Sequence, residues 1–500
     1  MQVRELNGFY YVDNPVLELD WLSDYDGKYY FVLNNITRSL FIRDILPLIE
    51  AGVCLCTSFL KNKIINFIQA PTRQVANTYS IIEPDPEHKP LKAHQREAVS
   101  RMIQYPRYGF FLGTGTGKTL IAISFLLTMK IKTAIIVTPK KVISQYKQEI
   151  DKYIPNNNYI VTNYEQLNKY TNMKVEALIL DESHRAKNYT SNTSMFIKQI
   201  SRNADNVYLF TGTPQDKQRH EIVAQLYLLY DHFMPGKTKF IHRYFNLDDY
   251  FEPKSEKKEF SRELIDMIES ITWGKETDDV LDLSACPEKN HIIECEHPGL
   301  TYSQLVKDRL IEYPNGSVVV ADSKAILKIK LREICSGFVR VERGEQKGTK
   351  PLPNTKVKEL AKLLTNLPNA IIYTEFKYDI KYITETCDKL NKSYVVVDGS
   401  TKKSADLIDK FKKNEVDYLI IQNRSGNAGL DLTCTNNIIF YSLPESYIVY
   451  HQCKGRIRRP GQTKECNYYH LICKDTIEKD ILNSLRRKKS FTTKLFKVYQ

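Results

Sequence analysis

Between two strongly apolar segments stands the stretch that decides the fold, Leu112-Gly113-Thr114-Gly115-Thr116-Gly117-Lys118-Thr119. YGFFL (108–112) leads into it and TLIAISFLL (119–127) follows, so the order is buried strand, turn and helix. The N–H groups of such a turn and the positive end of the helix attract phosphate. The stretch therefore predicts a phosphate loop, with Lys118 reaching the β- and γ-phosphates and Thr119 holding Mg²⁺. Leu112 stands where the strict pattern has glycine.

Short apolar runs recur after this loop and alternate with helix-length segments. In the first half they are AIIVT (134–138), ALIL (177–180) and VYLF (207–210). After a charge-rich stretch from about 235 to 350 the alternation resumes with AIIYT (370–374), DYLIIQ (417–422), NIIFY (437–441) and YYHLI (468–472). Continuous apolar runs are typical of strands buried on both faces of a parallel sheet. The pattern predicts an α/β protein with two doubly wound lobes.

Composition limits the class of protein further. The 500 residues carry a net charge of +13, which favours an acidic partner such as nucleic acid. No apolar stretch approaches the roughly 20 residues that a membrane span needs. The ten cysteines form no CxxC pair, so we expect no structural zinc and reduced thiols. A soluble, intracellular protein of the cytoplasm is the expectation.

The same patterns suggest four regions. Residues 1–88 combine aromatic strands (GFYYV, GKYYFVL) with a helical pattern near SLFIRDILPLIEAG, which predicts a small α+β accessory domain. The first lobe is expected at 89–285 and the second, with its linking segment, at 286–485. The tail 486–500 holds six basic residues and no acidic one, whereas 1–88 hold seven basic and eleven acidic residues. Such a tail is either a solvated end or a phosphate contact.

Two adjacent acids follow the apolar run at 177–180, in Leu180-Asp181-Glu182-Ser183-His184. Ligands bind at the carboxyl ends of strands in open α/β sheets. We therefore expect Asp181 to hold Mg²⁺ and Glu182 to orient the attacking water. On its own such a pair is more often a helix N-cap, but it stands 63 residues after the phosphate loop.

A basic cluster lies far downstream, in Gln452-Cys-Lys-Gly-Arg456-Ile-Arg-Arg459-Pro-Gly-Gln462. Arg456 and Arg459 are three residues apart and would share one face of a helix. An ordinary basic cluster is a solvated face. The alternative is a pair of arginine fingers that stabilise charge on the γ-phosphate during hydrolysis.

These segments resemble known motifs. DESH, LFTGTP (209–214), SGNAGLDLT (425–433) and QCKGRIRRPGQ (452–462) look like motifs II, III, V and VI of superfamily-two helicases, specifically the Swi/Snf-like branch. LKAHQREAV (91–99) is similar to the adenine-reading Q motif, with Gln95 as the reader. The resemblance implies two RecA-like lobes that use ATP and Mg²⁺, with Asp431 among the nucleotide-binding residues. Compact members of this kind are similar to bacteriophage proteins.

The resemblance also implies a path for nucleic acid over both lobes. The residues that it points to are Thr138, Pro139, Lys140, Asn163, Tyr164, Thr374 and Ser425. Two departures from the family make coupling to DNA less certain: Gln215-Asp216-Lys217 follows motif III without the usual Asn, and the helix ADLIDKF lacks the expected Arg.

The leading hypothesis is an ATP-driven translocase on double-stranded DNA that remodels forks or junctions in recombination, repair or replication. A strand-separating DNA or RNA helicase and an ATP-gated nucleic-acid clamp are the alternatives. The role of residues 1–88 and any protein partner stay open.

Overall fold

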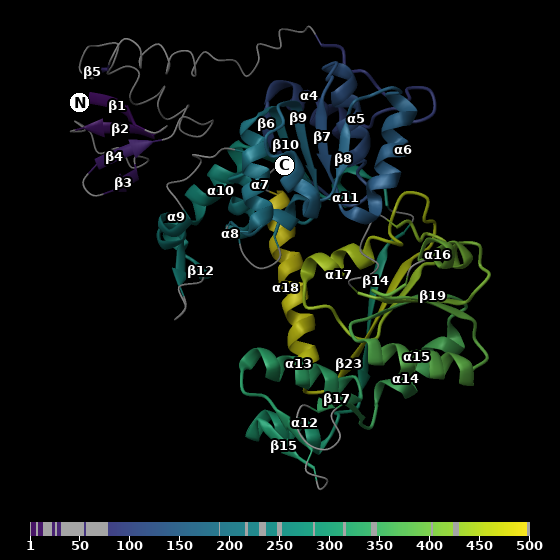
Figure 1. Cartoon of the computed structure of the whole chain (residues 1–500). Coiled ribbons are helices and arrows are strands. Elements are labelled where there is room, and N and C mark those ends of the chain that lie inside the picture. The colour runs from purple at the N-terminus through teal and green to yellow at the C-terminus, as the bar shows by residue number, and fades with distance from the viewer. Residues whose placement is uncertain are drawn as a thin grey trace. The chain divides into compact units, whose positions relative to one another are not determined.

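The computed structural model divides into two compact units, Met1–Val280 with Phe496–Gln500, and Leu281–Leu495 (Figure 1). It describes residues 79–497 with gaps at 190, 216–218, 230–236, 248–252, 284–285, 314–316, 342–347, 402–403 and 424–429. Before residue 79 it describes five strands.

A six-stranded parallel sheet forms the centre of the first unit, in the order β13-β6-β10-β9-β7-β8. Its strands are β6 (Arg107–Leu112), β7 (Ala134–Val137), β8 (Ile160–Thr162), β9 (Val175–Asp181), β10 (Ala204–Thr211) and β13 (Thr272–Lys275). The apolar runs beginning at 108, 134, 177 and 207 all lie in these strands, because a residue in a parallel sheet covered on both faces is buried whichever way it points.

Helices cover both faces of this sheet. One core contains side chains of α4 (Ala93–Gln104), α5 (Lys118–Thr128) and α6 (Ile143–Tyr153) together with alternate residues of β6. Phe110 and Leu112 belong to this core, whereas Phe111 between them is buried outside it, as the two-residue period of a strand requires. The other helices described in this unit are α7 (Asn192–Arg202), α8 (His220–Leu226), α9 (Lys237–Tyr244), α10 (Ser261–Ser270) and α11 (Thr277–Val280). Its other short elements are β11 (Phe245–Leu247), β12 (Pro253–Glu256), η1 (Lys140–Val142), η2 (Tyr164–Tyr170), η3 (Ser183–Ala186) and η4 (Lys258–Phe260).

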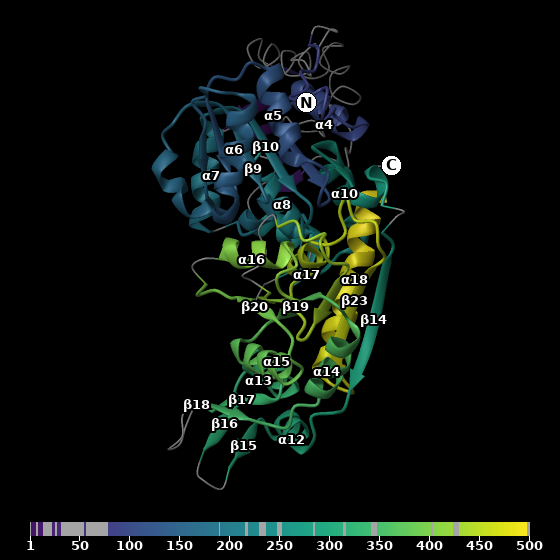
Figure 2. The same ribbon diagram turned by 90° about the vertical axis from the view of Figure 1, so that its right-hand side faces the viewer.

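The second unit repeats this plan with another six-stranded parallel sheet, in the order β14-β23-β22-β19-β21-β20. Its strands are β14 (Glu288–Cys295), β19 (Ala370–Thr374), β20 (Tyr394–Val397), β21 (Tyr418–Gln422), β22 (Asn437–Phe440) and β23 (Cys466–Cys473). Figure 2 shows β14 along the edge of this sheet.

Helices again lie on both faces of the second sheet. Side chains of α14 (Lys356–Asn366) and α15 (Lys377–Lys389) share one core with the strands, and Figures 1 and 2 show α17 (Tyr447–Lys454) on the opposite face. The remaining helices are α12 (Leu300–Asp308), α13 (Lys324–Cys335), α16 (Ser404–Lys412) and α18 (Ile477–Lys497). Two small antiparallel pairs join β15 (Leu310–Glu312) to β16 (Val318–Val320), and β17 (Phe338–Val341) to β18 (Gly348–Pro351).

Five strands near the N-terminus form a separate sheet in the order β3-β4-β2-β1-β5. They are β1 (Gln2–Leu6), β2 (Phe9–Asp13), β3 (Ser23–Tyr25), β4 (Lys28–Phe31) and β5 (Leu55–Cys56). The two aromatic stretches expected to be strands overlap β2 and β4. The helix expected near SLFIRDILPLIEAG lies outside the described residues.

The prediction of two doubly wound α/β lobes is confirmed. In the described part of the chain, no helix combines the length and the apolar character that crossing a membrane requires.

Candidate nucleotide-binding site

The glycine-rich stretch connects the end of β6 to the start of α5, as its sequence predicts. Gly115 (φ 79°) and Gly117 (φ 84°) both have left-handed backbone conformations that strain other residues. Within the turn, Thr116 Oγ1 donates to Gly113 O at 2.9 Å. Lys118 Nζ donates to Leu112 O and Gly113 O, each at 3.1 Å, so its ammonium lies over the loop.

Two residues of α4 contact the outside of this loop. Gln95 Nε2 donates to Thr116 O at 2.9 Å, and His94 Nε2 lies 3.0 Å from the same oxygen. Gln95 Oε1 in turn accepts the Lys92 N–H at 2.9 Å. A Cβ at position 117 would collide with Gln95 Nε2, so this contact requires glycine there. Both ends of the Gln95 amide therefore have partners, and its role as the adenine reader stays a prediction.

The acid pair lies at the carboxyl end of β9, as expected. Burial first, and then the charge of Glu182, raise the pKa of Asp181 to about 6, although Lys118 acts against them. Thr138 Oγ1 donates to Asp181 Oδ2 at 3.3 Å, and Tyr164 Oη donates to Asp181 O at 2.6 Å. Glu182 has a left-handed backbone (φ 55°), and its Oε2 lies 3.2 Å from His184 Nδ1.

Thr119 and Asp181, the two expected Mg²⁺ ligands, have a common neighbour in the buried Tyr146. Burial raises the pKa of Tyr146, the charge of Asp181 raises it further, and a hydrogen bond to Thr119 acts in the opposite direction. A hydroxyl and a carboxylate are the oxygen donors that Mg²⁺ prefers. The buried Asp181 carboxylate also has the charge of Glu182 beside it, and a divalent cation would offset both charges. The residues present therefore fit Mg²⁺.

Side chains connect the acid pair to the segment that follows β10. His184 Nδ1 lies 3.0 Å from Thr211 Oγ1. Ser183 Oγ donates to Gln225 Oε1 at 2.9 Å, and Gln225 Nε2 donates to Pro214 O at 2.5 Å. Gln225 is fully buried on α8 and was missed by the sequence analysis. An amide within the apolar pattern IVAQL was the only available signal.

The residues expected to contact nucleic acid in the first unit differ in exposure. Thr138, Asn163 and Tyr164 are buried. The first and last of these bind Asp181, and Asn163 Oδ1 accepts the Glu165 N–H at 3.1 Å. Pro139 is half-buried, whereas Lys140 is exposed. Lys140 is therefore the member of this set whose side chain is available to a phosphate.

Thr374 of the second unit is also buried, at the carboxyl end of β19. Its Oγ1 donates to Asp379 Oδ2 at 2.5 Å, and Ser442 Oγ donates to the same oxygen at 2.7 Å. The Thr374 side chain therefore fixes the start of α15. Ser425, the other expected contact, lies outside the described residues.

Arg456 and Arg459 lie just beyond the end of α17, so the helix that would place them on one face is not present there. Arg456 is buried, and its Nη1 donates to Leu430 O at 3.3 Å. Arg459 Nε donates to Gly455 O at 2.6 Å. Burial first, and then the charge of Arg456, lower the pKa of Arg459 to about 10, and the nearby Asp431 partly offsets this. An anion bound beside Arg459 would favour the charged form of this guanidinium.

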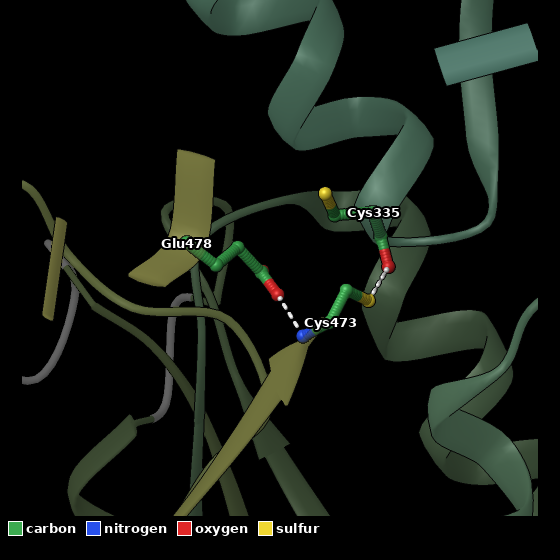
Figure 3. Close-up of side chains that lie close together, drawn as sticks. All are labelled: Cys335, Cys473 and Glu478. Atoms are coloured by element: carbon green, nitrogen blue, oxygen red, sulfur yellow. Dashed lines mark hydrogen bonds between the residues drawn. The ribbon is translucent and has the colours of Figure 1, made fainter. Parts of the chain in front are cut away.

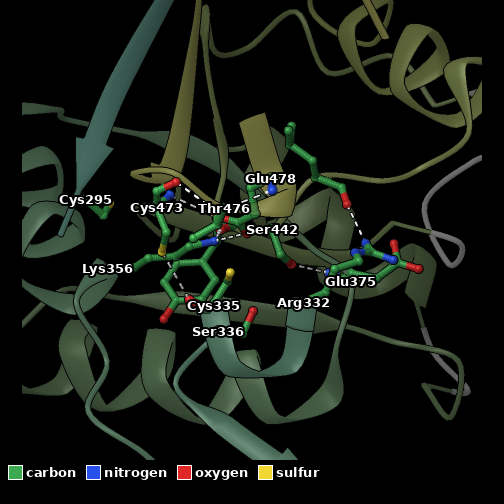
Figure 4. A network of polar contacts seen from close by, with 12 residues as sticks. Cys295, Arg332, Cys335, Ser336, Lys356, Glu375, Ser442, Cys473, Thr476 and Glu478 are labelled. Atoms are coloured by element: carbon green, nitrogen blue, oxygen red, sulfur yellow. Dashed lines mark hydrogen bonds and ion pairs between the residues drawn. The ribbon is translucent and has the colours of Figure 1, made fainter. Parts of the chain in front are cut away.

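Metal-ligand atoms gather at one place in the described residues, Cys335, Cys473 and Glu478 (Figure 3). The Cys473 N–H donates to Glu478 Oε2 at 3.0 Å. Lys356 Nζ donates to Glu478 Oε1 at 2.5 Å and to Tyr441 O at 2.8 Å, within the network of Figure 4. Burial raises the pKa of the Cys335 thiol. Because an ammonium already compensates the carboxylate, we interpret this network as a structural one. The absence of structural zinc stays a prediction.

Three domain families match parts of the chain, and the first two of the matched ranges overlap. They are the res subunit of type III restriction enzymes at residues 88–176, the SNF2-related domain at 156–336 and the helicase conserved C-terminal domain at 355–461.

Individual proteins are similar at low identity. The ATP-dependent helicase fft3 of Schizosaccharomyces pombe is 24% identical, covering 62% of this chain and 42% of its own. The DNA repair and recombination protein RAD54B of Gallus gallus is 23% identical, covering 78% and 53%. The chain thus spans about half or less of these relatives. A Sulfolobus solfataricus SWI2/SNF2 ATPase core in complex with double-stranded DNA has 18% identity and a TM-score of 0.38, covering 83% of this chain and 94% of that chain.

Two parallel α/β lobes, with a glycine-rich loop and an acid pair at strand ends of the first, are the arrangement expected of a two-lobed helicase. The SNF2-related domain and the helicase conserved C-terminal domain, together with the similar proteins, support a Swi/Snf-like helicase of superfamily two. The resemblance seen in the sequence is thereby confirmed, whereas a bacteriophage origin stays a prediction.

Proposed function

We propose that this protein hydrolyses ATP and uses the energy to move along double-stranded DNA. The observation that carries the proposal is the connected set of contacts in the first unit. Lys118 lies over the phosphate loop, and the acid pair is joined through His184 and Thr211 to the segment after β10. A change at the γ-phosphate could reach that segment through these side chains.

Each group in the site has a proposed part in hydrolysis. Lys118 binds the β- and γ-phosphates, and Glu182 orients the attacking water. Thr119 and Asp181 hold Mg²⁺, which when bound neutralises charge on the β- and γ-phosphate oxygens. Arg456 and Arg459 stabilise the negative charge that develops on the γ-phosphate. Asp431, near Arg459, is proposed as a further nucleotide-binding residue.

The net charge of the chain and the names of similar proteins support DNA as the partner. The chain has a net charge of +13, and the tail 486–500 adds six basic residues and no acidic one. The names of two matching relatives, an ATP-dependent helicase and a DNA repair and recombination protein, agree with this choice. Contacts to phosphate carry no sequence information, so we expect little preference for base sequence.

The test measures ATP turnover with single strands, RNA and linear duplexes of increasing length. A translocase on duplex DNA turns over faster as the duplex lengthens, until travel rather than loading limits the rate. A clamp responds to duplex but not to its length, and a strand-separating helicase is stimulated by a single strand. Glu182→Gln should bind ATP and DNA but stay locked on the DNA. If all substrates gave the same turnover, the proposal would be wrong.

For the substrate we propose branched DNA, namely forks and four-way junctions, with the N-terminal region supplying the preference. Removing residues 1–78 should reduce junction migration more than duplex-stimulated turnover. The deletion stops at 78 because the next segment packs on the first unit: Ser124 Oγ donates to Ile82 O at 2.7 Å, and Glu83 Oε2 accepts the Leu91 N–H at 2.9 Å. Equal loss of both activities would contradict this proposal.

A further inference from the structure

A residue far along the chain makes a further hydrogen bond to the phosphate loop. Thr277, the first residue of α11 (labelled in Figure 1), donates through Oγ1 to Thr114 O at 2.9 Å. Two residues earlier, Lys275 O of β13 accepts the Gly113 N–H at 3.0 Å. The loop is therefore hydrogen-bonded to the last strand of its sheet and to the turn that follows.

The fit between this turn and the loop is close. A Cβ on Gly113 would lie 2.6 Å from Thr277 N and would collide with Thr277 Oγ1. Gly212 lies on another side of the loop, where a Cβ would be 3.1 Å from Leu112 O. The turn is itself held in shape, because Asp279 Oδ2 accepts the Glu276 N–H at 3.1 Å. Thr277 thus reaches the loop from a fixed position.

The geometry of the peptide bond gives this contact a consequence for phosphate binding. In a planar trans peptide the carbonyl of one residue and the N–H of the next point in opposite directions. The described backbone contains no cis peptide. Fixing Thr114 O towards Thr277 therefore turns the Gly115 N–H to the opposite side of the loop. In the same way, the contacts of Gln95 and His94 with Thr116 O turn the Gly117 N–H away from α4.

We propose that Thr277 is a positioning residue for the phosphate loop, which holds the Thr114–Gly115 peptide so that the Gly115 N–H donates to a nucleotide phosphate. Thr277 itself touches no phosphate. Because this inference rests on the proposed function, its test must separate the two.

The test compares Thr277→Val, which keeps the shape but loses the hydroxyl, with Thr277→Ser, which keeps the donor. Thr365→Val is the matched control, because Thr365 Oγ1 also donates to a backbone oxygen at 2.9 Å, that of Ala361, in the second unit. The quantities are the Kd of ADP and ATP, the KM and kcat of ATP turnover, and the melting temperature without nucleotide.

Losing one oriented hydrogen bond should weaken ADP and ATP alike by about five-fold in Thr277→Val. KM should rise by a similar factor while kcat stays within about two-fold, because the N–H serves ground and transition states equally. Thr277→Ser should restore wild-type values, and Thr365→Val should not change them. A general structural defect would instead lower the melting temperature and reduce kcat.

Unchanged nucleotide affinity in Thr277→Val, or equal damage in Thr277→Ser, would overturn the inference and leave the proposed function intact. If wild-type protein bound neither ADP nor ATP, the proposed function would fail first.

Discussion

His184 Nδ1 and Thr211 Oγ1 lie 3.0 Å apart, so the turn after β9 is tied to the end of β10 by one side-chain contact. The same ring nitrogen is 3.2 Å from Glu182 Oε2, and Thr211 Oγ1 also accepts the Thr213 N–H at 3.1 Å. Glu182, the acid proposed to orient the water, is therefore connected to the segment that follows β10 through His184 and Thr211.

Thr211→Val tests this connection, since it removes the hydroxyl and keeps the shape. We expect kcat to fall about five- to ten-fold, equivalent to roughly one hydrogen bond, while ADP affinity stays unchanged. Steady-state turnover with saturating duplex measures the effect. Thr211→Ser should retain most of the activity, and a Thr211→Val protein with normal kcat would show that the connection is not used.

Lys118→Ala should nearly abolish ATP hydrolysis because it removes the cation proposed to face the phosphates. Folding should be little affected, since the Lys118 ammonium binds only loop carbonyls at 3.1 Å among the contacts described. Exposed Lys147 on α6 provides the control, as Lys147→Ala should behave like wild type. Phosphate release measures both, and near-normal release from Lys118→Ala would refute the phosphate-loop assignment.

Arg459→Ala should leave ATP affinity within a few-fold and reduce hydrolysis by about 10³ or more, as for a lost arginine finger. Its neighbour Arg458 is the contrast, because Arg458 Nε donates to Cys286 O at 3.1 Å and Nη1 lies 3.6 Å from Glu288. Arg458→Ala should lower stability more than turnover. A large loss of nucleotide affinity in Arg459→Ala would instead show that Arg459 contacts the nucleotide in the ground state.

Lys356→Met should destabilise the second unit by about 3–5 kcal/mol, because it leaves the buried Glu478 carboxylate without its ammonium. Burial acts to lower the pKa of Lys356, but the charge of Glu478 acts more strongly with its other neighbours and the net pKa is raised, so Lys356 is charged at neutral pH. The double variant Lys356→Met/Glu478→Leu should recover much of this loss. Urea unfolding measures both, and equal stability of the two variants would contradict the pairing.

His470 should make stability depend on pH. This fully buried ring lies 2.8 Å from Tyr450 Oη, and burial, its largest influence, lowers its pKa to about 3. The unfolded chain takes up the proton near pH 6.5 and the folded chain only near 3. The free energy of unfolding therefore falls as pH drops through this window, by up to about 1.4 kcal/mol per unit. In His470→Gln, the free energy of unfolding should depend less on pH between pH 7 and 5 than in the wild type. An unchanged slope would show that another group causes the pH dependence.

The sequence predicted the central strands of the two sheets better than it predicted their edge strands. Strands buried on both faces are continuous apolar runs, so the central strands of both units stand out. The edge strand β14 has an exposed side, and its mixed sequence EKNHIIEC falls in the stretch read as irregular. β13 is short and contains Gly274, so it too was missed.

The site could be predicted from the sequence where its chemistry depends on one short, continuous segment. The phosphate loop and acid pair depend on adjacent residues, whereas Gln225 and Thr277 reach the site from distant segments. The family resemblance pointed to Thr138, Tyr164 and Thr374 as nucleic-acid contacts, but their hydroxyls donate to a buried carboxylate or a backbone carbonyl. Sequence alone does not distinguish these two uses.

The position of β13 has a consequence for the order in which the first unit is completed during synthesis. β6 is the first strand of its sheet to be made, yet one of its two neighbours is the last. The Thr277 hydroxyl and the carbonyl that it holds are separated by 163 residues. In a nascent chain that has emerged only to residue 271, one edge of β6 is unpaired. The loop that follows β6 then lacks its hydrogen bond from Thr277. The loop proposed to bind nucleotide is therefore complete only after the ribosome has made β13 and Thr277, so we expect nucleotide binding to follow the early steps of folding.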